Sequence, residues 1–480
     1  MESAKISIVR TGGGSILSGP GLRKGFSTGS TSAAAVKASI RYYFEDKKFD
    51  SVEIKMPGGE YASLKVAFLS KFNLEHKESE PFISKSVLIK DSGDDFADVT
   101  GGIEICADFT VIDKKDKNAV KSLKKYYEKF LVYNIIKCPS AEDSTIIFAS
   151  SKGIGTVKRK GLPVKTGFPA INPVPHKMIE SAAEEELKSK ILKLRAEVKD
   201  SRGKIFFSVL YVPEGEKIAE RTLNPRLGIE GGISILGTSG YVVPISAKAW
   251  LETIKACLSF LEANGINTCV FTPGRFSEKA ALKIFKNLRR ESFIEIGDYV
   301  SYSLRKVSGT GIKNIIFVGQ FGKIVKIAHG ARNTNAKYTA LDLGFLAETA
   351  KEAVKKRNEN DAERIYGLII GSNTSREAFG YITSDEFSIY SDDILSKLLK
   401  KAAEKLYNIV KNAGSGSDRS FGAETEAGVE VNTNVNVNVN VNVNVDVEVK
   451  VEDPVKGGHS VDIEILLIDY GGNEIKRERL

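Results

Sequence analysis

One stretch decides the fold class of the C-terminal half of the chain: "TCVFTPGRFSEKAALKIFKNL", residues 268–288. It starts with a short apolar run, turns at a Pro-Gly pair and continues as a helix over residues 277–288. The same order returns further on, where "SFIEIG" precedes a helix over residues 298–308 and "NIIFVG" follows it. Because apolar runs alternate with helices of about a dozen residues, the sequence predicts a parallel, doubly wound sheet.

Around this stretch, a Rossmann-like α/β domain is expected to cover residues 229–413. The apolar run "ISILG" at residues 233–237 is expected to open it, and further helices are predicted over residues 247–263, 343–356 and 392–411. Ligands of such sheets bind at the carboxyl ends of the strands. The loops that follow the apolar runs are therefore the first candidates for a binding site.

The N-terminal half has a different pattern. Strand-like runs such as "SVEIKM", "SVLIKD", "TIIFAS" and "KIFFSVLYV" are mixed with helices predicted over residues 33–44, 117–133 and 176–194. This mixture predicts an α+β domain over residues 21–228, preceded by a flexible Gly/Ser-rich extension, residues 1–20.

The C-terminal end of the chain carries a low-complexity segment. A Gly/Ser linker and a Val-Asn alternation occupy residues 414–460, and a strand is expected within residues 461–480. Period-two alternation favours β structure, but a strand usually has about five or six residues. We therefore interpret the Val-Asn tract as an insertion that is disordered or forms a hairpin.

Composition limits the classes of function. The 480 residues carry a net charge of +9, but no block of five or six like charges appears, so nucleic acid is not an expected partner. No apolar stretch is long enough for a membrane span, which favours a soluble cytoplasmic protein that does not bind a membrane. The four cysteines and four histidines are scattered, so neither disulfides nor a protein-bound metal is expected. A homo-oligomer is compatible with the sequence.

The stretch "FSTGSTS" precedes a helix and has two interpretations. A hydroxyl of Ser30, Thr31 or Ser32 can cap the helix that begins at Ala33. Alternatively, glycine and the free amides of a helix N-terminus can hold a phosphate or carboxylate. The residues alone favour the cap.

Three carboxylates occur close together in "SGDDFADVTGG", at Asp94, Asp95 and Asp98. They can act as acid and base, bind a cation or bond to amide and hydroxyl groups. Asp and Gly also make turns, and for an isolated Asp pair the turn is the favoured interpretation. A second motif, "FVGQFGK", resembles a phosphate-binding P-loop, but Phe317 and Ile324 stand where glycine and Ser/Thr are required.

Taken together, the motifs resemble the cobalt-precorrin-5B C1-methyltransferase family of anaerobic cobalamin biosynthesis. The matching segments run from residue 22 to about residue 334: "LRKGFSTGSTSAAAVKA", "SGDDFADVTGGIEI", "GIGTVKRKGLPVKTGFPAINPVPHKMI", "IAERTLNPRLGIEGGISILGTSGYVVPIS" and "IIFVGQFGKIVKIAHGARNT". Two family histidines are replaced here, by Gln320 and by Asn335.

The resemblance implies methyl transfer from S-adenosylmethionine to C1 of cobalt-precorrin-5B, giving cobalt-precorrin-6A, with cobalt carried by the tetrapyrrole substrate. A related tetrapyrrole methyltransferase and a non-catalytic tetrapyrrole-binding protein are the alternatives. The 21–228 domain is expected to face the tetrapyrrole, and the 229–413 domain the methyl donor.

Roles for individual residues follow from combining the motifs with this family. The expected catalytic carboxylates are Asp94, Asp95 and Asp98. The expected substrate contacts are Ser27, Thr28, Gly29, Ser30, Asn172, Asn224, Arg226 and Lys323. The expected contacts to S-adenosylmethionine are Gly237, Thr238, Ser239, Gly240, Asp298, Gly319 and Gly322.

Overall fold

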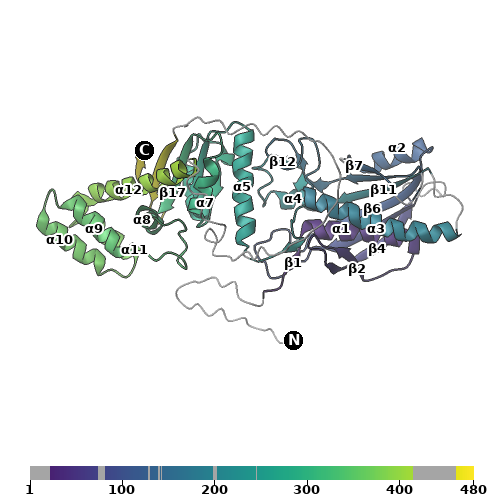
Figure 1. Cartoon of the computed structure of the whole chain (residues 1–480), viewed down its shortest axis with the longest axis horizontal. Helices are drawn as coiled ribbons and strands as arrows, with labels where there is room; N and C mark the ends of the chain where they lie inside the picture. The colour runs from purple at the N-terminus through teal and green to yellow at the C-terminus, as the bar shows by residue number, and fades with distance from the viewer. Residues whose placement is uncertain are drawn as a thin grey trace, which may run out of the picture. The chain divides into compact units, whose positions relative to one another are not determined.

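The computed structural model describes residues 22–73, 82–127, 130–138, 141, 143–197, 203–244, 246–414 and 461–480. The extension predicted for residues 1–20 and the Val-Asn tract lie outside these ranges. The chain divides into two compact units, with the division between Ser246 and Ala247. The sequence predicted this division between residues 228 and 229. Both units contain helices and strands, which confirms a mixed α/β fold (Figure 1).

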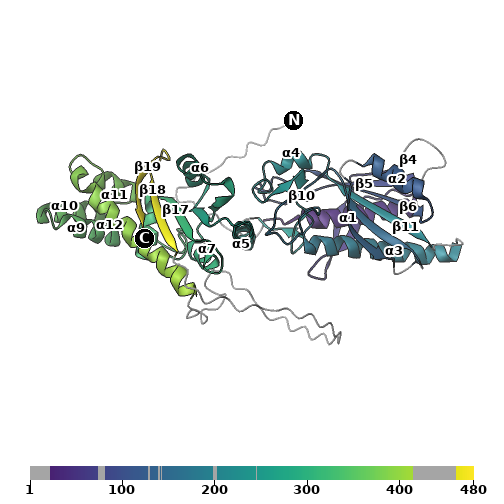
Figure 2. The same cartoon turned by 90° about the horizontal axis from the view of Figure 1, so that it is seen from above.

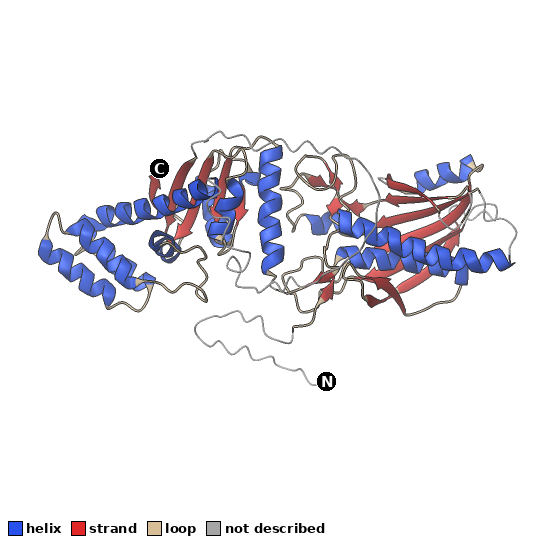
Figure 3. Ribbon diagram, viewed as in Figure 1, coloured by secondary structure: helices blue, strands red, loops and turns tan. Residues whose placement is uncertain are grey.

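The N-terminal unit is built on a six-stranded sheet (Figure 3). Its order is β4-β5-β6-β11-β8-β7, and only the β11–β8 pair is parallel. The strands are β4 (Phe68–Asn73), β5 (Phe82–Ile89), β6 (Glu104–Asp113), β7 (Leu131–Lys137), β8 (Thr145–Ser150) and β11 (Lys204–Tyr211). The helix predicted over residues 117–133 is too long, because α2 (Lys117–Tyr126) ends before β7, whose β-branched residues favour a strand.

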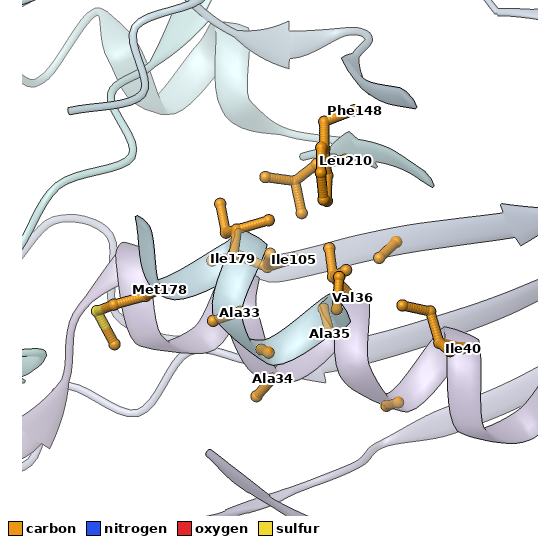
Figure 4. Packing of buried hydrophobic residues seen from close by; sticks show 14 of the residues in the cluster. Ala33, Ala34, Ala35, Val36, Ile40, Ile105, Phe148, Met178, Ile179 and Leu210 are labelled. Carbon is orange, nitrogen blue, oxygen red and sulfur yellow. The ribbon is translucent and has the colours of Figure 1, made fainter. Parts of the chain in front are cut away.

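Two long helices, α1 (Thr28–Glu45) and α3 (Pro173–Glu197), cover one face of this sheet. The first turns of α1 bury Ala33, Ala34 and Ala35, whose small side chains let the helix lie close to its neighbours. Figure 4 shows this alanine run beside Met178 and Ile179 of α3. Apolar residues of α2 pack on the opposite face of the sheet.

Short strand pairs complete the N-terminal unit, and all but the last of them join segments that are distant in the sequence. They are β1 (Gly25–Phe26) with β14 (Tyr241–Val242), β9 (Gly153–Ile154) with β13 (Gly232–Ile233), β10 (Thr156–Val157) with β12 (Ile229–Glu230), and β2 (Ser51–Lys55) with β3 (Tyr61–Lys65). A short helix, α4 (Gly215–Ala219), lies between β11 and β12. The run at residues 233–237 therefore does not open the C-terminal sheet, because Ile233 pairs with β9 and Ile235 is buried in the core beneath α1.

The C-terminal unit contains a five-stranded sheet of order β16-β15-β17-β18-β19. Its strands are β15 (Thr268–Thr272), β16 (Phe293–Glu295), β17 (Asn314–Gln320), β18 (Asp462–Ile468) and β19 (Glu474–Arg479). The first four in spatial order are parallel, and only β19 is antiparallel. Residues 461–480 thus form two strands rather than the single one expected, and β18 lies along β17 (Figure 2).

Helices complete the C-terminal unit: α5 (Ala247–Ala263), α6 (Arg275–Ile284), α7 (Val300–Val307), α8 (Phe321–His329), α9 (Leu343–Val354), α10 (Glu359–Ile370), α11 (Ser375–Ile382) and α12 (Ser388–Gly414). Apolar residues on both sides of the sheet are buried, Val270 and Val318 toward α6, and Phe271 and Phe317 on the alternate face. Helices on both faces explain why these strands read as nearly continuous apolar runs. None of the helices in the described ranges is long and apolar enough to cross a membrane.

Candidate functional site

The start of α1 is capped by Ser27. Its side-chain oxygen accepts a hydrogen bond of 3.1 Å from the amide of Ser30, and its carbonyl accepts from the amide of Thr31. The helix therefore begins at Thr28, five residues before the alanine run. The predicted cap at Ser30, Thr31 or Ser32 is wrong, because all three lie within the first helical turns.

The helix start binds another part of the chain, residues 236–240. The amide of Gly29 donates to the carbonyl of Leu236 at 3.0 Å, and the amide of Leu236 donates to Thr28 Oγ1 at 2.8 Å. Ser30 Oγ donates to the carbonyl of Gly240 at 2.6 Å. These hydroxyl groups are buried and hold protein backbone. The expected contact of residues 27–30 with a substrate carboxylate has no support from this arrangement.

Two glycines let the 236–240 segment lie close to the start of α1 and to the residue after β2. Gly237 has φ +130°, and a Cβ there would lie 2.3 Å from Ser27 Oγ. Gly240 has φ +80°, and a Cβ there would lie 2.6 Å from the terminal methyl of Met56. The exposed Thr238 and Ser239 lie between them. These four of the seven predicted donor contacts therefore belong to the N-terminal unit, and not to the C-terminal domain in which the sequence placed them.

The three predicted catalytic carboxylates have different surroundings. Asp98 forms an ion pair with the buried ammonium group of Lys90. It also accepts hydrogen bonds from Ser92 Oγ at 2.8 Å and from the amide and hydroxyl of Thr100 at 2.9 and 2.6 Å. Burial disfavours its charged form, but the bonds from Lys90 and Thr100 outweigh burial and lower the pKa of Asp98. This carboxylate supports the loop and is poorly suited to accept a proton.

Asp94 and Asp95 lie at the outer end of the same loop. The Asp94 carboxylate accepts a 2.6 Å hydrogen bond from the amide of Arg23, which ties the loop to the chain beside β1. Asp95 accepts a 3.1 Å bond from the amide of Ala97 and makes a local turn. The side chain of Phe96, between the two anchored ends, is 98% exposed. Of the three carboxylates, Asp95 is thus the one held only by a local backbone turn.

The predicted asparagines position backbone. Asn224 is buried, donates to the carbonyl of Gly232 at 2.9 Å and accepts from Ser234 Oγ at 3.0 Å. The amide of Asn172 donates to the carbonyl of Ile235 at 2.9 Å, just before α3 begins. Both therefore hold residues 232–236, which lead into the segment bound by α1. Arg226 is half-buried in the turn before β12.

In the C-terminal unit, the strand order identifies the edge where a ligand would bind. The chain passes from β15 to the neighbouring β16, and then returns to place β17 on the other side of β15. In open parallel sheets, ligands bind at the carboxyl ends of the strands where the winding direction reverses. Here this point lies between the loops that follow β15 and β17. Gly319, a predicted donor contact, lies near the end of β17.

The sequence assigned no individual residue of the loop after β15 to the donor site. Gly274 precedes α6, and no side chain caps this helix. An added Cβ at Gly274 would meet only Glu295 Oε1 within 4 Å, at 3.8 Å, so the position is open. Glu295 ends β16, the strand that completes the β15–α6–β16 unit. The sequence contained a pattern that could have identified this loop, because "TPG" follows a predicted strand in the same way as "VGQ".

A polar cluster surrounds Asp298, which lies three residues after Glu295, the last residue of β16. Its Oδ1 atom forms an ion pair with Lys323 and accepts a 2.6 Å bond from Thr334 Oγ1, and its Oδ2 atom accepts a 3.1 Å bond from Asn335 Nδ2. Burial opposes ionisation, but Lys323 and Thr334 outweigh it and lower the pKa of Asp298. Lys323, expected to contact substrate, and Asp298, expected to contact the donor, therefore bond to each other.

The second glycine of the "GQFG" loop has a packing role. A Cβ at Gly322 would lie 2.8 Å from Ser375 Oγ, so the first turn of α8 packs closely against the start of α11. A Cβ at Gly319 would lie 2.8 Å from the ring of Phe317. Both glycines thus lie close to neighbouring side chains around the end of β17, and neither distance tests donor binding.

Comparison with known proteins gives a consistent relationship. The family model described as CbiD matches residues 16–244, nearly the whole N-terminal unit. A cobalt-precorrin-5B C(1)-methyltransferase from Geobacter metallireducens is 36% identical over 340 residues, covering 69% of this chain and 81% of the relative. The enzyme of that name from Geotalea daltonii is 37% identical over 329 residues, covering 68% of this chain and 79% of the relative.

A crystal structure of a cobalamin biosynthesis protein from Archaeoglobus fulgidus also matches, with 24% identity, a TM-score of 0.31 and coverage of 66% of this chain and 83% of that chain. The relatives with more than 30% identity place the chain among the methyltransferases of cobalamin biosynthesis. The chain belongs to the cobalt-precorrin-5B C(1)-methyltransferase family.

Proposed function

We propose that this protein methylates C1 of cobalt-precorrin-5B, with S-adenosylmethionine as the methyl donor and cobalt-precorrin-6A as the product. The observation that carries the proposal is the 36% identity to a cobalt-precorrin-5B C(1)-methyltransferase over 81% of its length. Similarity of this extent covers both compact units and not a single motif.

The donor is proposed to bind at the carboxyl edge of the Rossmann-like sheet in the C-terminal unit. Support comes from the reversal of winding between β15 and β17 and from the open position at Gly274. In dinucleotide-binding folds, an acidic residue about 20 residues after the glycine turn binds a ribose hydroxyl. Glu295 has the corresponding place at the end of β16. Asp298, the residue predicted from sequence, bonds to Lys323, Thr334 and Asn335.

The donor supplies an activated methyl group on a sulfonium, so the protein needs no nucleophilic residue. Its contribution is to align the methyl group with the acceptor carbon and to exclude water. The N-terminal unit is proposed to hold the tetrapyrrole. In that unit the loop at residues 91–102 and the 236–240 segment meet the start of α1 and are each fixed by backbone hydrogen bonds. Such rigid loops suit a positioning role.

A product assay tests the reaction. The full chain is incubated anaerobically with donor labelled in its methyl group and with cobalt-precorrin-5B, and the product is analysed by mass spectrometry and NMR. We expect one labelled methyl group at C1. A label at another ring carbon would favour a related tetrapyrrole methyltransferase, and binding of the macrocycle without S-adenosylhomocysteine formation would favour a carrier.

Calorimetry with S-adenosylmethionine tests the donor site separately. Glu295→Gln is expected to weaken donor binding about tenfold, as expected for loss of a charge-assisted hydrogen bond. Asp298→Asn is the comparison variant, because it removes the carboxylate that the sequence alone favoured. Weakened binding in Asp298→Asn with unchanged binding in Glu295→Gln would reverse the assignment.

A further inference from the structure

A separate pocket of about 290 Å³ lies within the C-terminal unit. It is formed by α7, by the turn that ends α8 and by one face of α12. The polar residues that line it are Ser301, Arg305, Arg332, Lys405, Asn408 and Asn412. None of these groups belongs to the proposed donor site at the ends of β15 and β17.

The pocket has an unusual balance of charge. Its three cationic residues, Arg305, Arg332 and Lys405, come from three different elements. Among the described residues that line the pocket, none is an aspartate or glutamate. A concave surface lined by charges of one sign concentrates ions of the opposite sign. This lining favours an anion as a ligand.

The lining groups are donors as well as charges. Arginine presents a planar set of N–H groups that matches carboxylate and phosphate oxygens. The amide group of Asn408 and the hydroxyl of Ser301 can add neutral hydrogen bonds. Ile327 and Ile409 provide an apolar wall. This combination suits a compact anion with several oxygen atoms.

Backbone contacts connect the elements that carry these cations. The carbonyl of Arg332 accepts a 3.0 Å hydrogen bond from the amide of Ser301, which ties the turn to α7. Gly330 ends α8 with φ +104°, a conformation that favours glycine, and the side chain of Lys405 passes over it. Lys405, Asn408 and Asn412 are spaced by three and four residues, so they share one face of α12. Three elements thus bring these polar residues together around the pocket.

We propose that this pocket binds a small multivalent anion bearing phosphate or carboxylate groups. Its volume is at the lower end of the roughly 300–1,000 Å³ of ordinary ligand pockets, which fits a small anion or one side chain of a larger molecule. Two sources share this chemistry: a free phosphate-type ion, and a carboxylate side chain of the tetrapyrrole. Only the second source rests on the proposed function.

Isothermal titration of the full chain with inorganic pyrophosphate at low ionic strength tests the site. We expect the parent protein to bind it, and Arg332→Gln and Lys405→Gln each to weaken binding about tenfold. Lys400→Gln is the matched control, because it removes the same charge from an exposed position of α12 outside the pocket. No binding by the parent, or equal weakening in the control, would overturn the proposal.

A second measurement separates the two sources. If a tetrapyrrole carboxylate occupies the pocket, Arg332→Gln raises KM for cobalt-precorrin-5B with little change in kcat, and pyrophosphate competes with the substrate. If a free anion occupies it, KM is unchanged while pyrophosphate binding is still lost. Pyrophosphate binding does not depend on methyl transfer, so an inactive protein would still decide whether the site exists.

Discussion

The ion pair between Lys90 and Asp98 gives the most direct test of how the 91–102 loop works. The side chain of Lys90 is 2% exposed and that of Asp98 is 15% exposed. In Asp98→Asn, the amide oxygen can keep the two bonds from Thr100, but the new NH₂ group then faces the Lys90 ammonium, and a donor meets a donor. Lys90 is left with Ser92 Oγ at 3.1 Å.

Removing one partner of a buried ion pair typically costs about 3–5 kcal/mol, because the other charge stays buried. We expect a loss of this size in Asp98→Asn, and a smaller loss in the double variant with Lys90→Met than the two single losses predict when added. Urea unfolding followed by far-UV circular dichroism measures it. Fluorescence of Trp250, the only tryptophan, reports the C-terminal unit and should not shift.

The matched control is Asp95→Asn, the same chemical change in the same loop at a residue with only a local turn bond. A loss below about 1 kcal/mol in Asp98→Asn would refute the structural role. Native stability with abolished turnover would restore Asp98 as a catalytic carboxylate.

Because folding lowers the pKa of Asp98, its contribution to the free energy of unfolding is present above the unfolded pKa of about 3.9 and is lost as pH falls through the folded pKa.

Three further predictions concern other residues. Asp95→Asn should retain stability but lower single-turnover methylation at least about tenfold, because a carboxylate that accepts a proton or orders the substrate depends on its charge. Turnover equal to that of the parent would mean that Asp95 only forms a turn. Gly237→Ala should lower the free energy of unfolding by about 1–3 kcal/mol in urea titrations, because φ is +130° and the new methyl group would meet Ser27. Gly59→Ala is the control for backbone strain, because φ there is +98° and an added Cβ meets no atom within 4 Å. Burial raises the pKa of Asp108 to about 6, against bonds from two tyrosines, so the native state binds the proton more tightly than the unfolded chain. Stability of the N-terminal unit should therefore fall by up to about 3 kcal/mol between pH 4 and pH 6, and Asp108→Asn should remove this slope in pH-dependent unfolding curves.

Elements with a strong local pattern were predicted well. The helix predicted over residues 247–263 has the bounds of α5, and α9 and α12 differ from their predictions by a few residues. In each case apolar residues at helical spacing face the core. The parallel pairing of β15, β16 and β17 also followed from the alternation of apolar runs and helices. Local sequence is sufficient to predict an element when its buried residues recur at the spacing of a helix or strand.

Elements that depend on distant partners were predicted poorly. The run at residues 233–237 has the composition of a central strand, but it pairs with residues 153–154 and packs beneath α1. Nothing near it in the sequence indicates this. The final strand pair shows the same limit, since β18 joins β17 across an intervening segment of more than 100 residues.

The start of α1 shows why a local motif can indicate a chemistry without identifying the partner. The "FSTGSTS" stretch was expected to bind a group with oxygen acceptors, and its hydroxyl and amide donors do so. The acceptors are the carbonyls of Leu236 and Gly240, more than 200 residues further along the chain. Backbone carbonyls and carboxylates present the same kind of acceptor to a helix start, so the residues alone do not distinguish them. These donors therefore position the 236–240 segment, and the Asp95→Asn variant tests whether the neighbouring 91–102 loop contributes a charge to the reaction.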